Sequence, residues 1–296
     1  MKIIEKRKLW FLISGVIILA GLVSFIFRGF NLDIEFAGGT MLEFDLHQEV
    51  KDLSEIEAIA AEVSKDTNPQ VQTVAGAGGD FLISIKVKEI DSAQISELYD
   101  RIAGIYGLDT ENRADLIRES SISPVISGEM KSAAVVSTVI TCILILLYIT
   151  VRFRDICFGL SALIPLIHDV LIMLAMYTLF RIPVNNTFIV ALLTIVGYSI
   201  NNTIVVFDRI RENRGDFRKN QLVQLGDTSV LQTLGRSLAS SFTTIITVFL
   251  LFLLGVQSLR WFALPLLVGL LAGTYSSIFI ATPIWYMLEK AIHKNS

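Results

Sequence analysis

The sequence predicts a polytopic α-helical membrane protein with six transmembrane helices and an α+β domain inserted between the first helix and the second. Apolar residues make up 53% of the 296-residue chain and charged residues only 18%, whereas a soluble domain carries about 25% charged residues. Residues 28–131 nevertheless hold 20 of the 28 acidic residues and 9 of the 25 basic ones. An acidic block of soluble character is therefore inserted into an otherwise apolar chain.

Six apolar runs are long enough to cross a bilayer. A hydrocarbon core of about 30 Å requires about 20 helical residues, and helices satisfy their own backbone hydrogen bonds in that medium. The first run is too long for the apolar region of a signal peptide and no small-residue cleavage site follows it, so we expect a retained anchor. The runs are Leu9–Phe27, Ala133–Val151, Ile156–Phe180, Val184–Phe207, Leu238–Val256 and Trp261–Leu288.

The basic residues of the short connecting segments predict the orientation of the chain. Lysines and arginines gather before the first run, at 152–154, at 209–219 and after 289, whereas the opposite connections carry one arginine each. All four clusters lie on one side if both termini are cytoplasmic, which places the inserted domain outside. The predicted division is 1–27 for the cytoplasmic N-terminus and first helix, 28–132 for the extracytoplasmic α+β domain, 133–207 for helices two to four, 208–235 for a basic cytoplasmic loop, 236–288 for helices five and six, and 289–296 for a cytoplasmic tail.

The inserted block predicts a small domain with the order β-α-β-β-α-β, which is the ferredoxin-like arrangement. Alternating apolar residues indicate its strands, and apolar residues three and four positions apart indicate its helices. The glycine-rich run 76–80 predicts a hairpin between the two middle strands. The elements are strand Met41–Leu46, helix Asp52–Lys65, strands Val71–Ala75 and Phe81–Val87, helix Asp91–Tyr106 and strand Ala114–Ile122.

Neither this domain nor the cysteines indicate catalysis. The domain has no Ser-His-Asp spacing and no cluster of histidines and cysteines, and Cys142 and Cys157 lack the spacing of a metal or redox site. We therefore expect no enzyme activity, no metal and no cofactor.

Polar residues inside the apolar runs are the candidate functional residues, because ionisable groups in a membrane are costly and usually functional. His168 and Asp169 lie in the third run, Asn201 and Asn202 lie in the fourth, and Arg236 precedes the fifth. A buried carboxylate must be protonated, paired or hydrated. Asp169 is therefore either part of a proton or ion relay or the partner of His168 in a structural hydrogen bond. Arg236 is either functional or an anchor at the lipid headgroups.

The remaining polar residues of the bundle have simpler interpretations. Asp208, Arg209 and Arg211 follow the fourth run and are expected as interfacial charges that fix the topology. The hydroxyl residues at 240–247 and the small residues at 269–273 are typical of helix packing. Together the patterns describe a membrane protein with a polar interior and a large outer domain, which favours transport or translocation.

Five motifs, in this order and with these gaps, resemble the SecF family of the bacterial Sec protein-export machinery. The resemblance covers nearly the whole chain, and the stretch 197–213 is its most specific part. The motifs are Asp33–Thr40 (DIEFAGGT, with Gly38 and Gly39), Ser123–Glu129 (SPVISGE, with Pro124, Gly128 and Glu129), Leu166–Val170 (LIHDV), Gly197–Asn213 (GYSINNTIVVFDRIREN, with Gly197, Tyr198, Asp208, Arg209 and Arg211) and Gly235–Leu238 (GRSL).

The resemblance implies a fold, partners and an activity. Members of the SecF family have six transmembrane helices and are similar to one half of an RND-type transporter. They pair with SecD, which is a comparable half, and associate with the SecYEG channel in the bacterial inner or plasma membrane. The SecD–SecF pair is expected to use the proton-motive force to complete preprotein export after the ATP-driven step of SecA. No nucleic acid is implied as a partner.

One position departs from the family pattern. Family members usually carry aspartate where this chain has Asn202, and the resemblance gives that aspartate a proton-relay role near the arginine that matches Arg236. An amide does not ionise at ordinary pH, so it cannot relay a proton as a carboxylate does. Three accounts remain open: a carboxylate of Asp169 or of SecD carries the proton, the coupling ion is Na⁺ instead of H⁺, or the chain is a less active variant. We favour a carboxylate of SecD.

Three rival functions remain. A small-molecule exporter of the RND kind predicts a duplicated second half, which this sequence does not contain. An intramembrane protease requires a Ser-His or paired-Asp arrangement, whereas Asp169 is the one carboxylate deep in an apolar run. A structural subunit of the translocon without energy coupling is favoured by Asn202.

Overall fold

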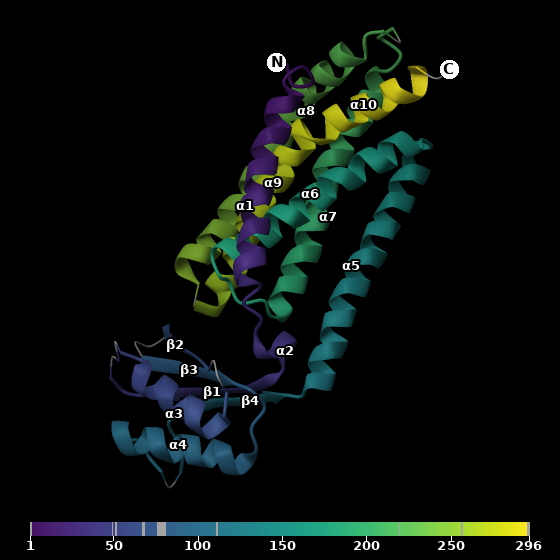
Figure 1. Cartoon of the computed structure of the whole chain (residues 1–296). Coiled ribbons are helices and arrows are strands. Elements are labelled where there is room, and N and C mark those ends of the chain that lie inside the picture. The colour runs from purple at the N-terminus through teal and green to yellow at the C-terminus, as the bar shows by residue number, and fades with distance from the viewer. Residues whose placement is uncertain are drawn as a thin grey trace.

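A membrane bundle and a smaller α+β domain make up the chain, and two connections join them (Figure 1). This domain is called the outer domain after the position that the sequence predicts for it. The computed structural model describes residues 2–48, 50, 52–66, 69–75, 81–110, 112–218, 220–255 and 257–294. Within these ranges, six helical spans are long and apolar enough to cross a membrane. The predicted class, a polytopic helical membrane protein, is therefore confirmed.

In the part of the chain that the structure describes, seven helices form the six spans of the bundle, because the last span is divided at Ile280. Pro283 lies in the first turn after this break, where a missing backbone N–H is tolerated. The run expected as one helix, Trp261–Leu288, is thus two. The helices are α1 (Arg7–Arg28), α5 (Pro124–Phe153), α6 (Ile156–Leu179), α7 (Asn186–Asn213), α8 (Leu222–Leu254), α9 (Gln257–Phe279) and α10 (Ala281–Lys294).

Two helices begin well before their apolar runs. Helix α5 begins at Pro124, where the Ser123 hydroxyl accepts from the N–H of Ile126 and proline occupies the first position. Helix α8 begins at Leu222, so most of the segment 208–235, expected as a loop, is helical. Hydropathy marks where the apolar residues begin, whereas a helix extends to its cap. Toward the outer domain, α5 stands apart from the other helices (Figure 1).

The outer domain has the predicted order of strands and helices, preceded by one extra helical turn, α2. Its four strands form an antiparallel sheet in the order β2-β3-β1-β4. The expected hairpin loop, 76–80, lies outside the described residues, but the strands on both sides of it are paired as predicted. The elements are α2 (Ile34–Ala37), β1 (Gly39–Asp45), α3 (Ser54–Ser64), β2 (Gln70–Ala75), β3 (Phe81–Val87), α4 (Ser92–Tyr106) and β4 (Leu116–Ile122).

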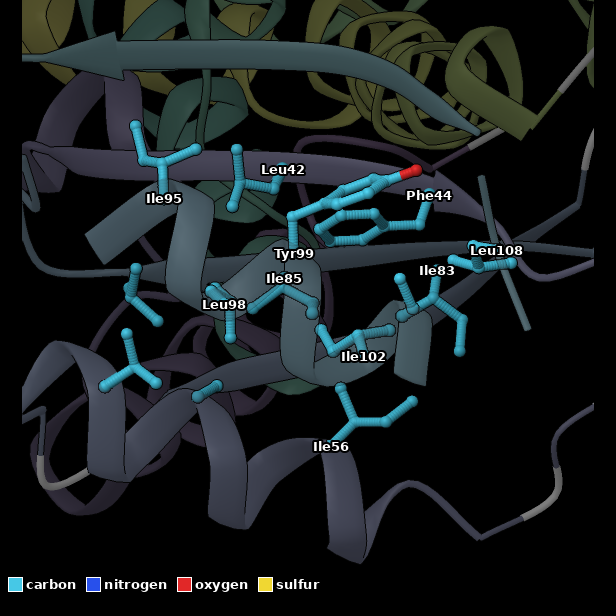
Figure 2. Close-up of a cluster of buried hydrophobic side chains, with 14 of the residues drawn as sticks. Leu42, Phe44, Ile56, Ile83, Ile85, Ile95, Leu98, Tyr99, Ile102 and Leu108 are labelled. Carbon is cyan, nitrogen blue, oxygen red and sulfur yellow. The ribbon is translucent and has the colours of Figure 1, made fainter. Parts of the chain in front are cut away.

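Helices α3 and α4 cover one face of this sheet and enclose an apolar core (Figure 2). Alternate residues of the central strands, among them Leu42 and Ile85, point into this core and meet Leu98 and Ile102 of α4. The hydroxyl of Tyr99 leaves the core and donates to the carbonyl of Asp109 (2.6 Å). The opposite face of the sheet is turned toward the outer ends of the membrane helices (Figure 1).

Candidate functional site

A hydrogen-bonded cluster centred on Asp169 lies inside the membrane bundle. Asp169 of α6 is 0% exposed. Its Oδ1 lies 2.8 Å from Nδ1 of His168, and its Oδ2 accepts from the hydroxyls of Ser199 (2.5 Å) and Ser276 (2.7 Å). On the other side of the imidazole, Nε2 lies 2.8 Å from the hydroxyl of Ser14. The cluster therefore joins four helices, α1, α6, α7 and α9.

The arrangement provides what a buried carboxylate needs. Three hydrogen-bonding partners on two oxygens compensate Asp169 for the loss of water. The contact with His168 also gives the carboxylate a neighbour that can hold a proton, and the imidazole extends the chain of contacts to Ser14. The structural hydrogen bond that the sequence left as one alternative is present. The relay alternative uses the same atoms and stays a prediction.

Sequence reasoning assigns no role to the serines of this cluster: Ser199 belongs to the motif 197–213 but not to the candidate residues, and Ser14 and Ser276 lie in no motif. Each is a serine in an apolar span, and each bonds to a group in a different helix. Serines usually bond within their own helix in such spans, so nothing in the chain order distinguishes these two. Only the crossing of α1 and α9 over α6 shows which hydroxyls reach the carboxylate.

A second buried polar cluster surrounds Asn202. This residue is 2% exposed, and its Nδ2 donates to the hydroxyl of Ser241 over 3.4 Å. The hydroxyl of Thr274 donates to the same oxygen (2.8 Å), so the cluster joins α7, α8 and α9. Position 202, where the family pattern has aspartate, thus lies in the interior of this chain.

Asn201 and Arg236 lie on the surface of the bundle instead. Both side chains are exposed, Asn201 on α7 and Arg236 on α8. Among the described residues, Arg236 has no ion pair or hydrogen bond with another side chain. A Cβ atom at Gly197 or at Gly235 would meet nothing within 4 Å. These positions are therefore open to lipid or to another protein.

The charges at the end of α7 are paired with neighbouring helices. Asp208 contacts Arg152 of α5 (3.5 Å) and Arg211 of its own helix (3.2 Å). Arg209 donates to the side-chain carbonyl of Gln232 in α8 (2.6 Å) and to Glu212 (2.8 Å). The contacts of Asp208 and Arg209 therefore connect α7 to α5 and α8. The topological role that the sequence predicts for these charges stays a prediction.

The motif residues of the outer domain have structural roles. Asp33 caps α2 and lies 3.1 Å from the ammonium group of Lys86. Gly38 (φ 78°) and Gly39 (φ 130°) turn the chain into β1 with left-handed backbone angles. A Cβ at Gly39 would also lie 2.3 Å from the carbonyl oxygen of Val87, so both positions require glycine.

The other motif residues lie outside both polar clusters. Pro124 begins α5, and Gly128 and Glu129 are exposed on its next turn. The hydroxyl of Tyr198 is buried without a hydrogen-bond partner among the described residues. Nor do the described residues contain a group of three or more histidines, cysteines and acidic residues that could hold a metal ion.

A bundle of six spans that buries polar clusters and carries an outer domain defines a multi-pass membrane protein of the transport type. Comparison with known proteins gives the family. The model of the family "Protein export membrane protein SecD/SecF, C-terminal" matches residues 106–291. The protein translocase subunits SecF of Alicyclobacillus acidocaldarius and Petrotoga mobilis are each 35% identical to this chain, over 96% and 95% of it and over 91% and 93% of their own lengths.

The fold is also that of a solved relative. The crystal structure of SecDF from Thermus thermophilus, a translocon-associated membrane protein, matches with a TM-score of 0.82 at 29% identity. A structure of SecDF in a super-membrane-facing form matches with a TM-score of 0.70. Both matches cover 100% of this chain and 39% of the SecDF chain. The chain belongs to the SecF family of protein translocase subunits, as the motifs predict.

Proposed function

We propose that the protein works with SecD to complete preprotein export through SecYEG after the SecA step, driven by the proton-motive force, and that it catalyses no reaction of its own. The observation that carries this proposal is the Asp169 cluster. It joins α1, which leads directly into the outer domain, to three other helices. A change of charge in this cluster would alter how these helices pack.

The exposed polar surface of α7 and α8 supports a partner half of the SecD kind. A cation facing hydrocarbon is costly, and Arg236 has no side-chain partner in the described chain. Exposed small and polar residues recur at helical spacing near it, which is typical of close helix contacts. We assign this surface to SecD and place a SecD carboxylate beside Arg236. The exposed residues are Thr187, Thr194, Gly197 and Asn201 on α7, and Arg236, Ser240, Thr243 and Thr247 on α8.

The junction between bundle and outer domain supports transmission of such a change. Residues 31–33 bond to Val184 in the turn before α7, through Val184 N–H to Asn31 O (2.8 Å) and Asp33 N–H to Val184 O (3.0 Å). The Glu35 carboxylate accepts from the N–H of Asn186, at the positive end of α7. Movement of α7 would therefore tilt the ferredoxin-like domain, which we place outside the cell with both termini in the cytoplasm.

The available energy is sufficient for such a movement. One elementary charge that crosses 100 mV gains about 2.3 kcal/mol, which shifts a two-state equilibrium roughly 40-fold. A proton that reaches the cluster at Asp169, or a SecD carboxylate beside Arg236, could supply this gain.

The test is export into inverted membrane vesicles that contain the chain together with SecD. Arg236→Met should abolish the stimulation of export by a membrane potential, whereas Arg236→Lys, which keeps the charge, should retain part of it. Co-purification with SecD checks that assembly is intact in both variants. Full stimulation with Arg236→Met would contradict the coupling role of this surface.

A structural subunit without energy coupling is the second candidate, and Asn202 is the observation that favours it. The side-chain amide of Asn202 does not ionise at ordinary pH, so it cannot accept and release a relayed proton. The residue lies in the interior of the chain. On this account, export with the unchanged protein would be insensitive to an uncoupler. On the coupling account, the uncoupler removes the stimulation, and Asn202→Asp leaves it intact or raises it.

A further inference from the structure

An apolar groove lies on the surface of the membrane bundle between α1 and α6. Its volume is about 430 Å³, and Thr178 is the one residue with a polar side chain among those that line it. The hydroxyl of Thr178 donates within the chain, with the carbonyl oxygens of Gly21 (3.1 Å) and Ala175 (2.9 Å) as acceptors. The groove therefore offers no unsatisfied hydroxyl to a ligand, and it suits an apolar occupant such as a hydrocarbon chain.

Two small residues set the distance between the helices at this groove. A Cβ atom at Gly21 would lie 2.2 Å from the Cβ of Ala175, so the two helices make their close contact there. Larger groove residues stay open to the surroundings: Leu22 is 51% exposed, Phe25 is 42% exposed and Leu171 is 39% exposed. Because Gly21 and Ala175 already pack against each other, they are not available to a third helix. This arrangement favours a lipid over a partner helix as the occupant.

The lining of the groove on α1 leads to an arginine. Ile18, Leu22 and Phe25 line the groove at spacings of three and four residues, and Arg28 continues the same stripe. The helix rises about 15 Å from Ile18 to Arg28, which is half of a hydrocarbon core about 30 Å thick. The groove and this arginine thus match the depth of one leaflet, on the side of the bundle from which α1 leads into the outer domain.

A second arginine reaches the same end of the groove from α6. Arg181 follows the groove residue Thr178 by three positions, and its Nη1 donates to the carbonyl oxygens of Arg28 (2.8 Å) and Gly29 (3.2 Å). Both arginine side chains are exposed. The side chain of Arg28 has no hydrogen bond or ion pair among the described residues. Two cations therefore lie where the groove meets the membrane surface.

No carboxylate of the described residues pairs with these two arginines. The next acidic residues after α1 are engaged elsewhere, since Asp33 lies 3.1 Å from the ammonium group of Lys86 and Glu35 accepts from the N–H of Asn186. Guanidinium groups bind phosphate oxygens with short, charge-assisted hydrogen bonds. The charge at this end of the groove thus complements an anionic headgroup.

We propose that the groove binds one acyl chain of an anionic phospholipid whose phosphate lies between Arg28 and Arg181. Lipid tails are as apolar as the groove itself, so the tail gains packing but little selectivity. The headgroup supplies the selectivity, because each arginine at the membrane surface strengthens the binding of an anionic lipid about fivefold. This site does not depend on the proposed function, which assigns a surface of α7 and α8 to SecD.

The test uses the full chain with SecD in nanodiscs of phosphatidylcholine. The probe is a trace of phosphatidylglycerol with a photoreactive diazirine in one acyl chain, and mass spectrometry of peptides locates the adducts. The matched probe is phosphatidylcholine with the same photoreactive chain. Phosphatidylglycerol should label the groove residues of α1 and α6 at least about tenfold more strongly. Equal labelling by the two probes would overturn the proposal, and so would the absence of adducts in the groove, which is the result expected if another protein fills it.

Arg28→Gln tests the headgroup contact without the loss of a side-chain contact within the described chain. It should lower labelling of the groove by phosphatidylglycerol about fivefold, whereas Arg28→Lys, which keeps the charge, should retain the labelling. The matched control is Arg260→Gln, because Arg260 is also exposed and also donates to a carbonyl at a helix end, that of Gly255 (2.9 Å), but does not border the groove. Labelling that is undiminished in Arg28→Gln would overturn the assigned headgroup site.

Leu22→Trp tests the groove itself, because the larger ring fills it from an exposed position on α1. Adducts on Leu171 and Leu174 of α6 should disappear. The matched control is Leu19→Trp, which is 59% exposed on the same helix but lies outside the groove lining, and it should label as the parent does. Co-purification with SecD and an unchanged temperature of unfolding show that both variants fold. Adducts on α6 that persist in Leu22→Trp would place the acyl chain elsewhere and overturn the proposal.

Discussion

The outer domain and the membrane bundle both bury apolar side chains, but they differ in what they bury beside them and in what they expose. In the outer domain, the enclosed core is apolar, as Leu42, Phe44 and Leu98 show. In the bundle, Asp169 and Ser276 are completely buried beside apolar clusters that include Trp285, and large apolar side chains also cover the outside. The same chain thus follows one rule in two solvents: each region turns toward its surroundings the groups that those surroundings solvate.

This difference predicts where each region is vulnerable. Water makes apolar burial the main stabilising term in the outer domain. Between membrane helices there is little hydrophobic driving force, because lipid tails are as apolar as leucine, and packing and hydrogen bonds between helices take over. The most damaging substitution should therefore be apolar-to-small in the outer domain and polar-to-apolar in the bundle.

The largest effect is expected from Asp169→Leu. It removes the carboxylate that accepts from Ser199 and Ser276 and contacts His168, and it leaves all three buried without that partner. Loss of one member of a buried charged network costs about 3–5 kcal/mol. Thermal unfolding of the complex with SecD in nanodiscs measures the loss. Asp169→Asn keeps an oxygen acceptor and should lose less, so an equal loss in both variants would show that only the charge matters.

A pair of leucines tests the comparison directly. Leu98→Ala in the outer core should cost about 2–5 kcal/mol of the free energy of unfolding of that domain. Leu12→Ala on α1, where the side chain is 63% exposed on the surface of the bundle, should change stability by less than about 0.5 kcal/mol. Protease resistance of the outer domain and thermal unfolding of the whole chain separate the two effects. A costly Leu12→Ala would mean that another protein, and not lipid, covers that face of α1.

Much of the fold follows from the sequence because hydropathy and periodicity act locally. The six spans and the strand and helix order of the outer domain are all present. Helix ends were less predictable: α8 continues into a polar segment, and α9 ends at a break before Pro283. These ends depend on caps and on packing against other helices, which a hydropathy pattern does not contain.

The candidate site was predictable only in part. Asp169 stands out because an acidic residue in an apolar run is rare, and His168 is its chain neighbour. Their partners Ser14 and Ser276 come from helices far away in the chain. The exposure of Arg236 and the burial of Asn202 likewise depend on how α7 and α8 rotate in the bundle. The rotations of α7 and α8 follow from packing between helices, which the order of residues in the chain does not reveal.

An effect smaller than the losses at Asp169 and Leu98 is expected from a single charged group of the outer domain, Asp115. Asp115 accepts from the backbone N–H of Asp109 (2.8 Å) and lies 2.8 Å from Nε2 of His47. These contacts, the Asp109 N–H first, hold the pKa of Asp115 below its usual value. The ionised form therefore stabilises the folded domain above the unfolded pKa of about 3.9, and this contribution disappears as the pH falls through the lower folded pKa.

Asp115→Asn should accordingly cost about 1–2 kcal/mol near neutral pH. The difference from the parent should shrink as the pH falls below about 4. Unfolding of the outer domain in the reconstituted chain, followed between about pH 3 and pH 7, measures this convergence. The matched control is Asp100→Asn, an exposed carboxylate on α4, which should follow the parent throughout. A difference for Asp115→Asn that persists undiminished at the acid end would show that packing, and not the charge, is what Asp115 contributes.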